Sequence, residues 1–320
     1  MSQLSHTRHR VVFGALIAAV FSLGFFASAR ADEEKTLRIG YQKSGVLLLV
    51  KHEGGLEKRL APLGWKVEWS EFIAGVPLLE ALGAGKLHIG HSGDAPVIFA
   101  QVAQSPLVYI AATHPSPESV GLLVPKESTL KTAADLKGRK VIVGKGSSAH
   151  FFLANALRQA GLTFADITPV YLNPNDARPA FERGAGDGWA VWDPFLASAE
   201  INAQARVLFS GKGVSPFREF YLAHERFAKA QPQIVAEVLA ELETVSARAK
   251  DDPAKIAAFL AQQLKIDLPT LEKAEFRKFR YDALPLTDDI VAEQQAVADL
   301  FAELSLIPKR VRVADIVWKK

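Results

Sequence analysis

Short apolar runs that suit β-strands alternate along this chain with segments whose apolar residues recur at helical spacing. Residues 37–41, 87–91 and 107–112 are predicted strands, and residues 76–82 and 96–102 are predicted helices. A further run, 65–72, alternates apolar and polar residues and predicts a half-exposed strand. Strands that alternate with helices are typical of a parallel sheet with helices on its faces. The pattern therefore predicts an α/β fold.

Two segments rich in Pro and Gly, residues 114–117 and 211–216, interrupt the alternation. Between them lies a second α/β series, with predicted strands at 121–125, 141–143, 167–172 and 189–192 and a helix around 178–182. A strand at 219–223 follows the second break. The remainder is almost wholly helical, most clearly at 234–249, 254–264 and 290–304.

Two breaks that flank one α/β unit predict two lobes joined by two crossings, with a cleft between the lobes. We expect lobe 1 to comprise residues 32–115 plus 217–320, including the helical C-terminal region, and lobe 2 to comprise residues 116–216. With 320 residues, 49% of them hydrophobic, the chain is long enough for two cores. A cleft between such lobes is a natural ligand site.

The first 31 residues predict a secretory signal peptide. Arg8 and Arg10 precede a 16-residue apolar run, 11–26, and small residues follow it at 27–31. A membrane anchor is the alternative, but the run is short for a span and is followed by three acidic residues. Cleavage after Ala29 or Ala31 fits, and we favour Ala31. The mature chain is therefore expected to be free in the periplasm.

The residue inventory excludes several classes of function. The chain has no Cys, so disulfides and a lipid-modified N-terminal cysteine are excluded. Of 38 Lys and Arg, three lie in residues 1–31, which leaves 35 against 35 acidic residues and no basic cluster for nucleic acid. The eight His are scattered, and no H-E-x-x-H motif or nucleophile elbow occurs. We expect no metal, no cofactor and no catalytic residues.

One strand-to-helix turn is suited to an anion. The apolar residues 141–143 lead into Gly144 and Gly146, and Ser147 and Ser148 are good N-cap residues for the helical pattern that follows. Such a turn points unpaired backbone N–H groups and two hydroxyls at one place. An ordinary capped helix explains the same residues, and local spacing leaves both interpretations open.

Five motifs, in order and at matching spacing, resemble the periplasmic aliphatic sulfonate-binding proteins of ABC importers (SsuA type). These are residues 39–43 (IGYQK), 90–96 (GHSGDAP), 135–138 (DLKG), 145–150 (KGSSAH) and 192–194 (WDP). The resemblance covers about residues 37–221. It implies a two-lobed type II solute-binding protein, expected to be a monomer, that closes on a small organic sulfonate and docks on a membrane permease.

The resemblance also defines the alternatives. Relatives divide their specificity among alkanesulfonates, taurine, nitrate, bicarbonate and thiamine precursors, and a ligand-presenting sensor would use the same pocket. One enzymatic relative makes a thiamine pyrimidine precursor, but that function would require an intracellular protein, against the predicted signal peptide. His88 stands where the family more often has Asp, and His91 replaces an aromatic or small residue. We expect capture of aliphatic sulfonates for sulfur acquisition.

A sulfonate is a permanent monoanion with three acceptor oxygens, so its site needs several donors. Ser147 and Ser148 are the best candidates, with Gly146 allowing close approach of the backbone. The other predicted ligand-binding residues follow predicted strands or adjoin the second crossing: Gln42, Ser44, Ser92, Gly93, Asp94, Trp192 and Arg218.

Four residues have a structural alternative of comparable weight or more. Asp94 is equally suited to a turn or N-cap. Arg218 could fork two sulfonate oxygens or form a surface ion pair. Trp192 could pack against the organic part of the ligand, although a Trp at a strand end is more often a core residue. His150, one turn into its helix, is expected to pack locally.

Overall fold

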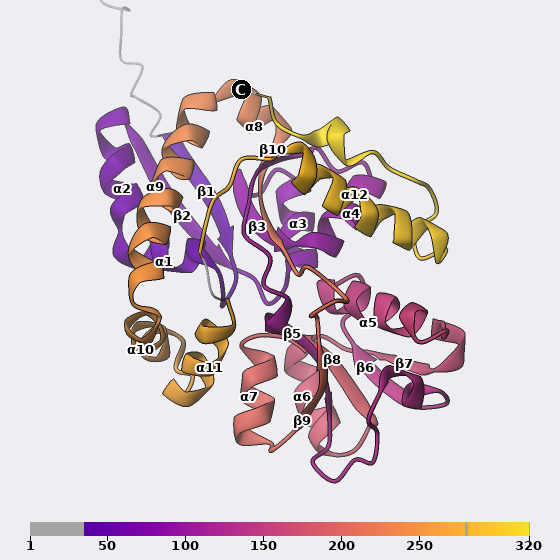
Figure 1. Ribbon diagram of the computed structural model, residues 1–320. Helices are drawn as coiled ribbons and strands as arrows, with labels where there is room; N and C mark the ends of the chain where they lie inside the picture. Colours follow the sequence, from indigo (N-terminus) through magenta and orange to yellow (C-terminus); the bar gives the residue numbers. More distant parts are fainter. Residues whose placement is uncertain (1–34, 279–280, 320) are drawn as a thin grey trace, which may run out of the picture. The chain divides into compact units, whose positions relative to one another are not determined.

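The computed structural model describes residues 35–278 and 281–319, and Thr36–Lys320 forms one compact unit (Figure 1). The predicted signal peptide, residues 1–31, lies outside the described residues. Two five-stranded sheets with helices build this unit, so the α/β prediction is confirmed. No helix in the described ranges has both the length and the apolar character needed to cross a membrane.

The first sheet has the strand order β2-β1-β3-β10-β4. Its strands are β1 (Lys35–Tyr41), β2 (Trp65–Glu71), β3 (Ile89–Gly93), β4 (Leu107–Ala112) and β10 (Glu219–His224). The helices from this part of the chain are α1 (Val46–Glu53), α2 (Gly55–Leu60), α3 (Gly75–Gly83) and α4 (Asp94–Val102).

The second sheet repeats this arrangement with the order β7-β6-β8-β5-β9. Its strands are β5 (Val120–Val124), β6 (Lys140–Val143), β7 (Thr168–Tyr171), β8 (Gly188–Trp192) and β9 (Arg206–Ser210). Helices α5 (Ser148–Gln159), α6 (Pro174–Glu182) and α7 (Phe195–Asn202) connect them. Short 3-10 helices occur at Ala61–Leu63, Pro117–Ser119, Ala133–Leu136, Phe164–Asp166 and Val313–Ile316.

The expectation of parallel sheets is wrong for one strand in each sheet. β10 runs antiparallel to both β3 and β4, and β5 runs antiparallel to both β8 and β9. Both strands follow a crossing between the sheets and not a helical return. The chain therefore enters each sheet from the opposite end, and the strand direction is reversed.

Apolar residues on both faces explain why β10 is a continuous apolar run. Phe220 and Leu222 belong to the core that includes α3 and α4, whereas Tyr221 and Ala223 belong to the core that includes α1 and α2. Successive side chains of a strand point to opposite faces, so a strand covered on both sides has few polar positions. In β6, Val141 and Val143 likewise face one core and Ile142 the other.

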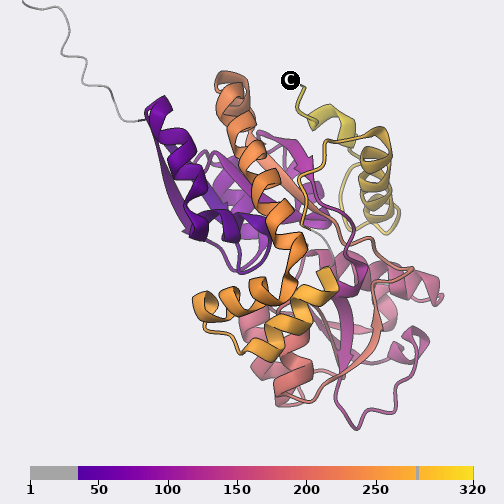
Figure 2. The ribbon, with the colours of Figure 1, turned by 60° about the vertical axis from the view of Figure 1, so that its left-hand side comes forward.

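The C-terminal helices are α8 (Glu225–Ala230), α9 (Pro232–Asp251), α10 (Pro253–Leu264), α11 (Leu268–Lys278) and α12 (Asp288–Glu303). In Figure 1, α9 lies beside α1 and α2, and α12 lies beside α4. Helix α11, which the periodicity did not single out, packs against α7 of the second sheet, as the gold and salmon segments of Figure 2 show. The end of the chain thus contacts both sheets.

Candidate functional site

A cavity with about 380 Å³ of empty space lies where elements of both sheets meet; we call it the first chamber. It is lined by Gln42, Ala74, Gly75, Val76, Gly93, Pro96, Ser147, Ser148, Trp192, Phe217 and Glu219. Three helices begin at its wall. Helix α3 begins at Gly75, α4 follows Gly93, and α5 begins at Ser148. Their first N–H groups have no partner within the helix, so this wall is rich in donors and carries partial positive charge.

The turn before α5 is partly occupied by its own capping bonds. The Ser147 hydroxyl donates to the Gly144 carbonyl at 2.7 Å and accepts the His150 N–H at 3.2 Å. Gly146, with a φ of 73°, donates its N–H to His150 Nδ1 at 3.3 Å. The capped helix that the sequence left as an alternative is therefore present. Ser147 lines the first chamber, whereas Gly146 does not.

Ser148 lies against the opposite wall of the chamber. A Cβ atom built on Gly93 would be 2.1 Å from Ser148 Oγ, a separation that real Cβ atoms do not tolerate. Gly93 belongs to the first sheet and Ser148 to the first turn of α5, so the sheet and the helix approach closely here at a residue without a side chain. Contact between α4 and α5 continues this approach.

Two predicted residues lie beside the first chamber and do not line it. Asp94 is buried, and its Oδ1 accepts the Ala95 N–H at 2.7 Å. Burial raises the pKa of Asp94 to about 7, although hydrogen bonds from the Ser148 side chain and the Ala95 N–H act in the opposite direction. Ser92 is fully buried, and its hydroxyl has no hydrogen-bond partner. Asp94 thus bonds within the first turn of α4 as the first helical residue, whereas the N-cap is Gly93.

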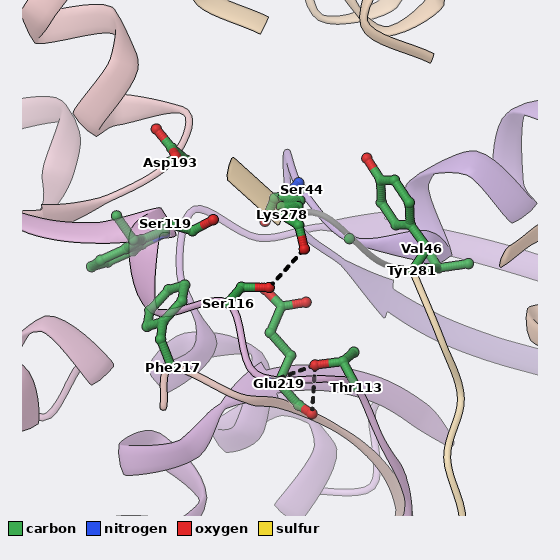
Figure 3. Close-up of a pocket in the computed structure, with 12 residues that line it drawn as sticks. Ser44, Val46, Thr113, Ser116, Ser119, Asp193, Phe217, Glu219, Lys278 and Tyr281 are labelled. Atoms are coloured by element: carbon green, nitrogen blue, oxygen red, sulfur yellow. Dashed lines mark hydrogen bonds between the residues drawn. The ribbon is translucent and has the colours of Figure 1, made fainter. Parts of the chain in front are cut away.

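A second cavity, with about 470 Å³ of empty space, shares Trp192, Phe217 and Glu219 with the first; we call it the second chamber (Figure 3). Its other lining residues are Ser44, Gly45, Val46, Thr113, Ser116, Ser119, Asp193, Lys278 and Tyr281. These residues come from both sheets, both crossings and the end of α11. The two chambers thus adjoin along one common wall.

Charged side chains distinguish the second chamber. Glu219 Oε2 lies 3.4 Å from His91 Nδ1. Burial would raise the pKa of Glu219, but the hydrogen bond and charge of His91, with the charge of Lys278, outweigh burial and lower it. Burial raises the pKa of Asp193 to about 6, against the opposing charge of Arg277 at 3.3 Å. Lys278 Nζ donates to Glu275 Oε1 at 3.0 Å.

Arg218 lines neither chamber. Its Nε donates to Glu293 Oε1 at 2.7 Å, its Nη2 to Glu293 Oε2 at 3.4 Å, and its Nη1 to the Thr113 carbonyl. The ion pair that the sequence left open is present, although it is largely buried and not on the surface. Arg218 thereby ties the second crossing to the first and to α12.

The remaining predicted residues are divided between the two chambers. Gln42 lines the first chamber while its Nε2 donates to the His91 carbonyl at 3.2 Å. Ser44 lines the second chamber. Trp192 lines both and packs edge-on against Phe195, with ring centroids 6.1 Å apart. Trp192 therefore lies between the two chambers.

Two further histidines considered in the sequence, His88 and His150, have structural partners. His88 stacks on Phe227 with centroids 4.4 Å apart, and burial, with the charge of Arg38, lowers its pKa to about 4. His150 is buried, and burial lowers its pKa to about 4 as well. His150 thus packs locally, as expected. Among the described residues, no group of three His, Asp or Glu side chains is placed to hold a metal ion.

Several lining residues were not predicted from the sequence: Val76, Phe217, Glu219, Asp193, Lys278, Tyr281, Ser116 and Ser119. Asp193 and Glu219 directly follow the predicted site residues Trp192 and Arg218 in the chain. This adjacency is the sequence signal that could have identified them. Lys278 and Tyr281 had no such signal, because they reach the chamber only through the packing of α11 on α7.

Comparison with known proteins gives a consistent result. Residues 66–256 match the family described as NMT1/THI5 like. A protein of Escherichia coli (strain K12) named for binding aliphatic sulfonates is 39% identical, over 97% of each chain. The solved alkanesulfonate-binding protein SsuA of Xanthomonas axonopodis pv. citri, bound to MOPS, is 40% identical with a TM-score of 0.85, covering 89% of this chain and 98% of that one.

The solved periplasmic aliphatic sulphonate-binding protein SsuA from Escherichia coli is also 40% identical, with a TM-score of 0.82 over 89% of this chain and 92% of that one. A desulfurization enzyme, DszB, shares the fold alone at 14% identity and a TM-score of 0.68. The long matches at 39–40% identity, on the same pair of sheets, show that this chain belongs to the family of periplasmic aliphatic sulfonate-binding proteins.

Proposed function

We propose that this protein captures aliphatic sulfonates in the periplasm and delivers them to the permease of an ABC importer for sulfur acquisition. The observation that carries the proposal is the first chamber, where three helix starts from both sheets converge on one cavity. A sulfonate has three acceptor oxygens and a permanent charge, and this wall supplies N–H groups together with the Ser148 hydroxyl, which would turn to the ligand from its hydrogen bond with Asp94.

The charge of the first chamber supports a monoanion. Glu219, which pairs with His91, is the one charged side chain among its described lining residues, and none is Lys or Arg, so helix starts supply the positive potential without a full countercharge. A dianion such as sulfate would lose more hydration than such a site returns. Trp192, Phe217, Val76 and Pro96 provide apolar surface for the carbon chain.

Closure on the ligand follows from the origin of the lining residues. We propose the lobes as residues 32–115 with 217–320 and residues 116–216, joined at the crossings. Gln42, Gly75 and Gly93 lie on one side of the first chamber, and Ser147, Ser148 and Trp192 on the other. A ligand that touches both sets favours the closed arrangement. The closed protein, as a monomer, would then dock on the permease.

Calorimetry of the mature chain with alkanesulfonates, nitrate, sulfate and a thiamine pyrimidine precursor tests this proposal. We expect an alkanesulfonate to bind at least tenfold more tightly than the other compounds and to raise the melting temperature. Tighter binding of nitrate or the pyrimidine would contradict the proposed ligand class. Mass spectrometry of recovered ligand tests for enzymatic conversion, and unchanged ligand is expected.

A further inference from the structure

We propose that the second chamber binds the distal end of the ligand and that this end is cationic, so that the preferred ligands are zwitterionic aminoalkanesulfonates. The inference rests on the proposed function, because it takes the sulfonate group to lie in the first chamber. It adds a site of opposite chemistry for the other end of the same molecule. Simple alkanesulfonates would fill the first chamber and leave the buried polar atoms of the second chamber without hydrogen-bond partners.

The shared lining of the two chambers makes a two-ended ligand possible. Trp192, Phe217 and Glu219 line both cavities, so a group bound at Ser148 has only this wall between itself and the second chamber. Two of these residues are aromatic and suit a short carbon chain. The third is a carboxylate, which is the natural partner for an ammonium group attached to that chain.

Carboxylates outnumber cations around the second chamber. Glu219 and Asp193 line it, and Lys278 is the one cation among its described lining residues. The Lys278 charge is already offset by Glu275, at 3.0 Å. Arg277, which approaches Asp193 at 3.3 Å, also pairs with Glu200, which Lys273 contacts at 2.9 Å. His91 lies 3.4 Å from Glu219 and does not line the chamber. A further positive charge is therefore favourable here, and a second anionic group is not.

Three buried polar atoms among the described lining residues of the second chamber have no hydrogen-bond partner. Asp193 Oδ2, the Ser119 hydroxyl and the Tyr281 hydroxyl have no hydrogen-bond partner, although the three residues are 3%, 1% and 6% exposed. In Figure 3 the Ser119 hydroxyl points inward among the residues that line the chamber. Buried polar atoms without partners are costly. An ammonium group can donate three hydrogen bonds, which suits this arrangement.

Glu219 lines both chambers, so its charge acts on both ends of the ligand. A simple alkanesulfonate would bring its negative charge near this carboxylate, which His91 and Lys278 already partly offset, and would offer it no positive charge of its own. In a zwitterion, the ammonium group enters the second chamber beside Glu219, and the same carboxylate becomes an attractive partner. Glu219 therefore acts as a specificity-determining residue for the distal group.

Matched ligand pairs test the inference by calorimetry on the mature chain. Taurine, 3-aminopropanesulfonate and 4-aminobutanesulfonate are each compared with the alkanesulfonate in which a methyl group replaces the ammonium. We expect the amino compound of the best-fitting length to bind about tenfold more tightly than its methyl partner. Equal or tighter binding of the methyl partner at all three lengths would overturn the inference while leaving the proposed function intact. Binding of neither series would overturn both.

Substitutions then locate the effect. In Glu219→Gln the preference for the amino compound should fall to about threefold or less, while the methyl partner binds as well as before or better. Asp193→Asn should act in the same direction. Glu118→Gln removes an equal charge from an exposed residue that lines neither chamber and should leave the preference unchanged. A preference retained in both Glu219→Gln and Asp193→Asn would contradict the inference, and parallel losses for both ligands would indicate structural damage and not recognition.

Discussion

The first and second chambers share three residues but obtain their polar groups from different sources. In the first, donors come from the backbone at the starts of α3, α4 and α5 and from Ser148. In the second, polarity comes from side chains, among them Glu219, Asp193 and Lys278. Backbone donors stabilise an anion without a titrating group, whereas side-chain charges discriminate between neutral and cationic ends. Under the proposed assignment, one cleft binds a common head group in the first chamber and selects its tail in the second.

The largest expected effect concerns the two buried carboxyls beside the chambers. Asp94 has a pKa of about 7 and Asp193 of about 6, both above the ordinary value. A carboxyl whose pKa rises on folding stabilises the fold below its unfolded pKa of about 4, and this stability is lost as pH rises through the folded pKa. Relative to wild type, Asp94→Asn should therefore gain in free energy of unfolding between pH 4 and 8, by at most about 4 kcal/mol.

Urea unfolding across this pH range measures that gain, and Asp193→Asn is the comparison. Its pH-dependent gain should be smaller and complete by about pH 7, because Arg277 partly compensates Asp193. The same pH profile in Asp94→Asn and in wild type would show that Asp94 is not held neutral in the folded protein.

The next effect tests the approach of the two walls of the first chamber. In Gly93→Ala the new methyl group would meet Ser148 Oγ, so closure around the ligand should be blocked and sulfonate affinity should fall about a hundredfold, or about 3 kcal/mol. Gly188→Ala, where the nearest atom is 3.4 Å from the added Cβ, is the control and should bind normally. Calorimetry measures the sulfonate affinity of both variants, and small-angle scattering measures whether each closes when ligand is added. Normal affinity in Gly93→Ala would mean that the walls do not meet in the bound state.

The third prediction distinguishes the roles of two adjacent serines. Ser148→Ala removes a hydroxyl at the meeting point of the walls, and sulfonate affinity should fall about tenfold. Ser147→Ala removes the hydroxyl that caps α5, so it should lower the free energy of unfolding by about 1 kcal/mol with a smaller loss of affinity. Calorimetry and urea unfolding of both variants make the comparison, and a larger affinity loss in Ser147→Ala would reverse the assigned roles.

The smallest effect lies outside both chambers. Lys273 on α11 pairs with Glu200 on α7 at 2.9 Å, and the Lys side chain is 38% exposed. Exposed pairs contribute little, so Lys273→Gln should lower the free energy of unfolding by about 0.5 kcal/mol. Affinity for either ligand series should change less than twofold. A large change in amino-ligand affinity alone would show that the position of α11 controls the second chamber.

Local signals in the sequence were sufficient for much of this molecule. Apolar periodicity identified every strand of the two sheets except β9, and several of the helices between them, but it did not predict α7. The turn at Ser147 was correctly predicted as a helix start, because an N-cap needs only residues within one turn. Five residues predicted from the sequence do line the first chamber: Gln42, Gly93, Ser147, Ser148 and Trp192. Each lies in or next to a turn or strand end, where open α/β sheets bind ligands.

Tertiary structure decided what depends on residues distant in the chain. The antiparallel direction of β5 and β10 follows from the crossings, which periodicity does not report. Arg218 pairs with Glu293, 75 positions away, so no local pattern could assign it to an ion pair in place of a ligand contact. Asp193 and Glu219 face the same cavity as Lys278 only because α11 packs on α7. Local hydrogen bonding and periodicity determine the elements, whereas long-range packing and burial determine which side chains meet.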